Sequence, residues 1–321
     1  ANGNLETIVG KYLEPANVGD AGTRVWQTHI GGSGDDNPYA MEQGPDGNLY
    51  ITGQTSSTNF PLLGGSAFTG SSLNQQAQTD IDVFVLKITP DGQSIKAAVV
   101  GGNGADDNYD VRTAPNGDVF VCGSTTSTNL LTLNAGSGAS NANAGGTDAL
   151  VFRISQDLSS LVWMRNYGGS SADRASIMLH NPVSGDLFVG GNTSSTNFPV
   201  TSPRQSVRGG SSAGFLQRLT GAGGTAWSSY FSSAASQSAS LLCMEFNVNR
   251  DQLVFGGVTT GLDATNIGGA YDASTNGNND FYVARMGIDQ TFLSGTYVGG
   301  SNNEVNMMGL NTDLNNDVFV F

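Results

Sequence analysis

The side chains best suited to bind a metal ion lie in two acidic loops. Asp35 and Asp36 follow the glycine pair Gly31-Gly32, and Asp106 and Asp107 follow the next such pair. Carboxylates clustered on a tight loop suit Ca²⁺, so these four aspartates are candidate calcium ligands. Later copies of the loop carry fewer carboxylates, and no twelve-residue EF-hand pattern occurs. We favour the simpler interpretation that Asp and Asn side chains cap strand ends by hydrogen bonding to nearby backbone.

A second set of polar residues stands at equivalent positions before a recurrent turn. They are Glu42, Arg112 and His180, with Asn311 at the matching place in the last, partial copy. If this position belongs to the innermost strand of a ring of sheets, the four side chains line a central channel and are candidates to contact a small ligand. Unlike polar residues are also expected in a water-filled channel that binds nothing, so both interpretations stay open.

Residues suited to catalysis are few. The chain has two histidines, His29 and His180, and neither belongs to a metal-binding spacing or to a Cys/His cluster. The many serines lie in polar loops, without a GxSxG elbow. We therefore expect no catalytic residues and no cofactor, with calcium kept as the alternative. An enzyme with a site at the mouth of the channel is the least favoured function.

These residues recur because the chain itself repeats. Glycine pairs, or their counterparts, recur at intervals of 64 to 70 residues. Each period contains four segments with the composition of β-strands, bounded by Gly, Pro, Asn or Asp. A turn such as Pro45-Asp46-Gly47 joins the first two segments, since Pro presets φ and Gly accepts positive φ. The predicted repeats are residues 1–32, 33–102, 103–169, 170–233, 234–300 and 301–321.

Two further recurrent features are expected to be structural. The third segment ends in a basic residue in four copies, and in three of them an aspartate stands five residues earlier. This pattern favours a structural charge pair between neighbouring strands or blades over a ligand site. The Ser-Thr-Asn that follows the second segment is expected to shape its loop, with a sugar contact as the less favoured alternative. The basic residues are Lys87, Arg153, Arg218 and Arg285, and the aspartates are Asp82, Asp148 and Asp280.

Four antiparallel strands in each period predict an all-β chain that forms a β-propeller of four-stranded blades. A single such sheet cannot bury both faces, so the blades must stack around an axis. Residues 1–32 supply the third and fourth strands of a blade, and residues 301–321 supply the first and second, which gives four full blades and a half-blade at each end. The half-blades would close a five-bladed ring, but we favour a longer native protein, because Phe321 ends the sequence inside a strand.

The repeat resembles the SBBP-type β-propeller repeats of large secreted and surface proteins of bacteria. The resemblance rests on GGSGDD (31–36), PDGNLYITGQTSSTNFP (45–61), DVFVLKITPDG (82–92) and the closing VGG (100–102), and it recurs over nearly the whole chain. The fourth copy departs from the pattern, with Ser232-Ser233 in place of the glycine pair. The resemblance implies an extracellular scaffold or adhesion role and brings no catalytic residues with it.

Composition narrows the function further. The formal net charge of −14, with 13 scattered basic residues, argues against nucleic-acid binding, and no apolar run is long enough to insert into a membrane. We expect a non-enzymatic extracellular structural or adhesive module of a bacterial surface protein or filament, with self-assembly as one form of it. Its protein or glycan partners would contact the Gly/Ser/Asn-rich inserts, residues 64–79 and 134–147. The alternative is a carbohydrate-binding or calcium-assisted lectin-like propeller.

Overall fold

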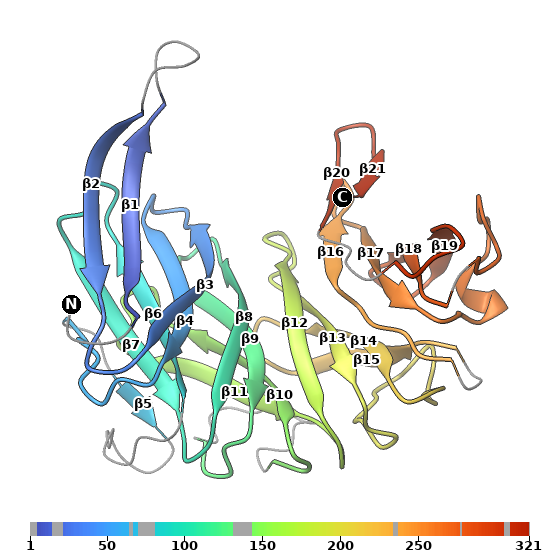
Figure 1. Ribbon diagram of the computed structural model, residues 1–321, viewed down its shortest axis with the longest axis horizontal. Helices are drawn as coiled ribbons and strands as arrows, with labels where there is room; N and C mark the ends of the chain where they lie inside the picture. Colours follow the sequence, from blue (N-terminus) through green and yellow to red (C-terminus); the bar gives the residue numbers. More distant parts are fainter. Residues whose placement is uncertain are drawn as a thin grey trace. The chain divides into compact units, whose positions relative to one another are not determined.

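A computed structural model describes residues 5–14, 22–63, 67–69, 81–130, 143–233, 237–276, 278–304 and 309–320 (Figure 1). These residues form β-strands and one short 3₁₀ helix, η1 (Ala264–Asn266). The predicted all-β class, with sheets of four antiparallel strands, is therefore confirmed. Within this described part of the chain there is no helix that is long and apolar enough to span a membrane.

Four large sheets each draw their strands from one repeat. In each sheet the four main strands lie side by side in chain order. Their pairs are antiparallel in the first, third and fourth large sheets, for which the register is described. The first sheet has an additional strand, β5 (Ala67–Thr69), which pairs with β7 in parallel at the edge. This fifth strand was not predicted. The sheets comprise β3 (Asp36–Gln43), β4 (Leu49–Thr55), β6 (Asp82–Ile88) and β7 (Ile95–Gly101); β8 (Asp106–Thr113), β9 (Val119–Thr125), β10 (Asp148–Ile154) and β11 (Leu161–Tyr167); β12 (Asp173–His180), β13 (Leu187–Thr193), β14 (Ala213–Leu219) and β15 (Thr225–Phe231); and β16 (Cys243–Phe246), β17 (Gln252–Thr259), β18 (Asp280–Gly287) and β19 (Phe292–Val298).

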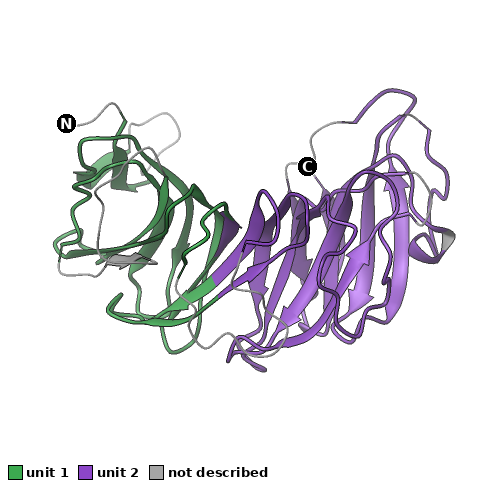
Figure 2. Cartoon of the chain, turned by 90° about the horizontal axis from the view of Figure 1, so that it is seen from below, with its two compact units in different colours: residues 1–121, 125–133, 152–164 green, residues 122–124, 134–151, 165–321 purple. Residues whose placement is uncertain are grey.

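Each end of the chain contributes a two-stranded antiparallel sheet. β1 (Thr7–Leu13) pairs with β2 (Thr23–Ile30), and β20 (Leu310–Thr312) pairs with β21 (Val318–Val320). The chain divides into two compact units, coloured in Figure 2 and described separately below. Unit 1 comprises residues 1–121, 125–133 and 152–164, and unit 2 comprises residues 122–124, 134–151 and 165–321.

The turn between the first and second strands follows the predicted chemistry. Gly47, Gly117 and Gly185 adopt φ of +78°, +84° and +75°, which side chains with a Cβ rarely adopt. In the first two copies the turn closes through a backbone hydrogen bond, from Gly47 to Gly44 and from Gly117 to Ala114. The hairpin is thus specified by local sequence.

In unit 1, sheets of neighbouring repeats share a core. Val9 and Ile30 of the β1–β2 sheet cluster with Ile51 and Phe84 of the next sheet, and β3 and β4 contact β8. The indole of Trp26 also reaches across, donating a 3.0 Å hydrogen bond to the carbonyl of Pro90. Tryptophan recurs five residues before a glycine pair or its counterpart, as Trp26, Trp163 and Trp227, and in this first copy it ties one repeat to the next.

Unit 2 repeats this arrangement. One buried cluster joins β13 to β17 through residues such as Phe188, Leu241 and Phe255, and a second joins β17 and β18 to Leu310 and Val318 of the last sheet. The indole of Trp227 donates a 2.9 Å hydrogen bond to the carbonyl of Ile288 in the following repeat. Within unit 2, consecutive sheets thus bury apolar side chains against each other.

Candidate functional site

The Ser-Thr-Asn segment clamps the loop that follows each glycine pair. In the first copy Ser57 Oγ donates to Asp36 Oδ2 at 2.8 Å, and Asn59 Oδ1 accepts from the backbone of Ser33 at 2.7 Å. Gly32 N–H completes the clamp by donating to Asp36 Oδ2 at 2.7 Å. The same contacts recur for Ser127, Asn129 and Asp106 and for Ser195, Asn197 and Asp173. These contacts agree with the loop-shaping interpretation of the motif.

The four aspartates proposed as calcium ligands fall into two environments. Asp36 and Asp106 are fully buried and belong to the clamps, and burial raises the pKa of Asp106 to about 7. Asp35 and Asp107 are partly exposed, and Asp107 Oδ1 accepts a 2.5 Å hydrogen bond from the amide of Gln54. Across the described ranges, no group of three or more His, Cys, Asp or Glu side chains is arranged to hold a metal ion.

Glu42 and Arg112, two of the four residues proposed to line a channel, interact in unit 1. Burial raises the pKa of Glu42 to about 6, and the charge of Arg112 partly opposes that rise. Arg112 also forms a 2.6 Å ion pair with Asp110 on the same strand. A carboxyl group that titrates near neutral pH is suited to proton transfer, but the ion pair gives this cluster a structural role as well.

His180 and Asn311 lie in unit 2, and the register separates His180 from the proposed set. Six residues separate His180 from its strand partner Leu187, whereas five separate Gln43 from Leu49. His180 therefore matches Gln43, and Leu179 takes the place of Glu42. The turn of the third copy has one extra residue, and a shift of one residue moves a side chain to the other face of a strand.

Three of the four basic residues of the third strands form ion pairs, but with different aspartates from those expected, while Arg285 donates to the backbone carbonyl of Asn316. Lys87 pairs with Asp46 at 2.9 Å, and the equivalent pairs are Arg153 with Asp118 at 2.7 Å and Arg218 with Asp186 at 2.5 Å. Each partner lies in the turn that precedes the second strand. Residues five apart on a strand point to opposite faces, which is why Asp82 and Asp148 cannot play this part.

An exposed tyrosine on β3 was not singled out by the sequence. The β3–β4 pairing passes from Pro38–Gly53 to Ala40–Thr52, so Tyr39 is a bulged residue, and its side chain is 54% exposed. Its hydroxyl donates to Gln54 Oε1 at 3.0 Å, and Gln54 in turn donates to Asp107 on β8. We call Tyr39, Gln54 and Asp107 the Tyr39 patch. Bulges commonly re-aim a side chain beside a functional site, and the tyrosine that recurs at position 109 was the available sequence signal.

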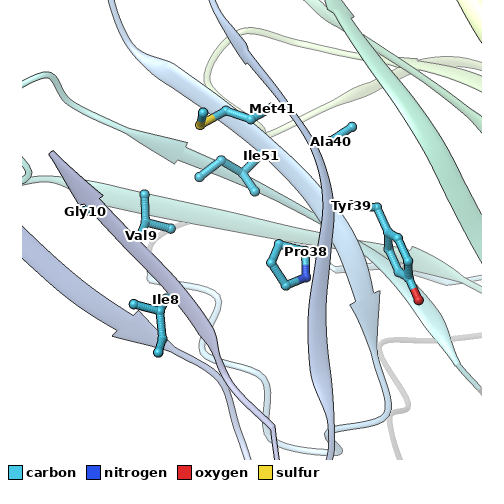
Figure 3. A pocket seen from close by; sticks show the side chains of 8 residues that line it. All are labelled: Ile8, Val9, Gly10, Pro38, Tyr39, Ala40, Met41 and Ile51. Atoms are coloured by element: carbon cyan, nitrogen blue, oxygen red, sulfur yellow. The ribbon is translucent and has the colours of Figure 1, made fainter. Parts of the chain in front are cut away.

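An apolar pocket of about 310 Å³ opens between β1 and β3 in unit 1. Figure 3 shows Val9, Pro38 and Ile51 in this space. Tyr39 also lines the pocket, and in this view its ring is directed away from Pro38 across β3. Ile8 and Met41 also line the pocket and are 57% and 62% exposed. Large apolar side chains left this exposed around a hollow are typical of a contact surface.

Comparison with known proteins adds no assignment. No protein-family model matches the chain, and no curated protein sequence matches it. The site must therefore be interpreted from its own geometry.

Proposed function

We propose that the chain is a β-propeller module that belongs to the extracellular or cell-surface part of a bacterial protein and acts without catalysis. The four-stranded sheets would be its blades. This is supported by the cores that neighbouring sheets share and by the tryptophan contacts that recur between repeats. The extracellular location is supported by the resemblance of the repeat to SBBP-type propellers.

The module is an adhesive scaffold in this proposal. The observation that carries it is the surface of β3, where the apolar pocket and the Tyr39 patch adjoin through Tyr39. Most recurrent polar residues of the repeat, in contrast, are engaged in clamps and ion pairs within the chain. Binding function is therefore assigned to the side chains that stay exposed. The inserts proposed earlier as a contact face lie largely outside the described residues.

The partner is a protein or a glycan surface, and one observation favours the glycan. An exposed aromatic ring beside an amide and a carboxylate offers an apolar face and directed hydrogen bonds together, which suits a sugar ring with its hydroxyl groups. A lectin-like module is thus the second candidate function.

Binding of the purified chain to a glycan array and to a panel of immobilised surface proteins tests this function. We expect Tyr39→Ala and Met41→Ser to weaken binding by about tenfold or more. Tyr271→Ala is the matched control, because Tyr271 is fully exposed in the other unit. Binding that is unchanged in both variants would place the contact elsewhere, and turnover of a bound glycan would refute the non-enzymatic assignment.

A further inference from the structure

Two acidic side chains meet at two places in unit 2 where one repeat passes to the next. The first begins the third strand of a repeat, and the second lies near the start of the following repeat, where Asp173 begins β12 and Glu304 precedes β20. In unit 2 these are Asp148 with Asp173, and Asp280 with Glu304. A backbone hydrogen bond beside each pair, from Asp173 to Thr147 and from Glu304 to Asn279, links the two consecutive repeats.

A glycine makes room for each pair. A Cβ on Gly168 would overlap Asp148 Oδ1 and lie 2.9 Å from Asp173 Oδ2. A Cβ on Gly299 would lie 2.5 Å from Asp280 Oδ1 and 3.1 Å from Glu304 Oε2. Both acids of a pair therefore reach the same small space beside the first glycine of the pair.

Oxygen atoms of these acids lack donors. Asp148 and Asp173 are 1% and 0% exposed, yet no hydrogen bond from the described residues reaches Oδ1 of either. In the other pair the two atoms beside Gly299, Asp280 Oδ1 and Glu304 Oε2, are likewise without a donor.

The Oδ2 atoms do accept hydrogen bonds, from Ala144 N–H in Asp148 and from Gly169 N–H and Ser195 Oγ in Asp173. Burying the second oxygen of each carboxylate without a donor is costly. Two carboxylates together also repel each other: burial and the nearby Asp173 raise the pKa of Asp148 to about 6, although the hydrogen bond from Ala144 opposes the rise.

The fourth copy removes the whole arrangement at once. Strand register identifies the positions that correspond to the acids. Ala213 lies opposite Thr193 just as Asp280 lies opposite Thr259, so Ala213 takes the place of the first acid. Ala239 lies opposite Thr259 just as Asp173 lies opposite Thr193, so Ala239 takes the place of the second acid. Both acids are thus alanines here, and Ser232 stands where the glycine would be. The sheets still form, so the acids are not required for the fold, and the three positions change as a unit.

We propose that these acid pairs are binding sites for a divalent cation of the Ca²⁺ class, each site linking two consecutive repeats. Ca²⁺ accepts mono- or bidentate carboxylates, backbone carbonyls and water as ligands, and one such ion neutralises both acids. Unit 1 has the equivalent pair Asp82 and Asp106, whose charges also act on each other. The cation would thus stiffen the succession of repeats without forming part of the surface that contacts a partner.

Calcium binding to the full chain tests the proposal. Equilibrium dialysis against Ca²⁺ up to about 10⁻³ M, the range of extracellular modules, should show bound calcium, and the melting temperature should rise relative to protein in EGTA. The double variant Asp148→Ala/Asp173→Ala copies the fourth repeat and should bind one Ca²⁺ fewer, without melting lower than the wild type in EGTA. Asp157→Ala, at a solvent-exposed turn of the same sheet, should keep the wild-type stoichiometry.

A gain of site provides a second test should the double variant fail to fold. Ser232→Gly/Ala213→Asp/Ala239→Asp should bind one Ca²⁺ more than the wild type. The proposal is overturned by a wild type that binds no calcium, or by a double variant that binds as many ions as the wild type. It is also overturned if the melting temperature changes with pH but not with Ca²⁺ concentration. In that case the two acids of a pair would share a proton and not a cation.

Discussion

Asp46 illustrates how single polar residues of the repeat are used. Its carboxylate accepts hydrogen bonds from Asn48, Tyr50 and Gln156 and pairs with Lys87. Burial alone would raise the pKa of Asp46, but the hydrogen bonds from Lys87, Asn48 and Tyr50 outweigh it and hold the pKa well below its usual range. A turn residue of one strand thus fixes side chains of two others, so its role is structural.

The ion pair of Arg218 predicts a cost for its removal. Arg218 donates through Nε and Nη2 to Asp186, at 3.0 and 2.5 Å. Because Asp186 is buried, Arg218→Met should leave an unpaired anion and lower the free energy of unfolding by about 2–3 kcal/mol. Urea denaturation measures this. Asp186→Asn in the same background should recover part of the loss, and Arg174→Met, at an exposed position of β12, should change little.

Glu42 predicts a pH dependence of stability. Its pKa in the fold is about 6, above the ordinary 4.5, so the native state holds the proton more tightly than the unfolded chain. Stability supported by this proton is present below pH 4.5 and is lost as the pH rises through 6. The shift corresponds to about 2 kcal/mol, and solvent screening of the partly exposed Glu42 lowers its effect on stability to about 1 kcal/mol.

Glu42→Gln removes this titration. Between pH 4 and 7 the wild type should lose about 1 kcal/mol of unfolding free energy relative to the variant. Arg112 and Asp110 also act on Glu42, and the variant keeps both of them. Parallel pH profiles of the two proteins would show that the Glu42 proton does not contribute.

At the scale of elements, the loop clamps hold each polar loop after a glycine pair in one conformation through side-chain hydrogen bonds to its backbone. Asn197 Oδ1 accepts from both the backbone and the hydroxyl of Ser170, at 2.8 and 3.1 Å. Asn197→Ala should cost about 1–2 kcal/mol of unfolding free energy and accelerate hydrogen exchange in the loop at 169–172. Thr196→Ala is the matched control, since Thr196 is exposed in the same loop. Equal losses in the two variants would mean that the clamp contributes nothing beyond general loop chemistry.

Sequence could predict the strands, because each carries its own signal of β composition, turn residues and repeat spacing. It could not predict the partners of the basic residues, since a pair such as Arg153 and Asp118 depends on which strands lie side by side. The position of His180 was missed because one extra turn residue changes the register without changing the motif. Tyr39 was missed because a bulge, not alternation, decides its exposure.

For the whole molecule, the shared cores imply that neighbouring sheets stabilise each other, as in other repeat proteins. Leu241 precedes β16 but lies over Gly190 of β13, and its backbone N–H donates to Asn192 Oδ1 at 2.8 Å. Leu241 therefore connects the third and fourth repeats within unit 2. A substitution of Leu241 should therefore destabilise the sheets of both repeats.

Leu241→Ala tests this coupling. The side chain is fully buried, so its truncation should lower the free energy of unfolding by about 3 kcal/mol. Hydrogen exchange should then accelerate in β13 and β17 together, because the lost contacts belong to both sheets. Leu242→Ala, one residue later at an exposed position, should leave exchange unchanged. Faster exchange confined to β16 and β17 would show that the sheets are stable individually, and stacking would then position the repeats without stabilising them.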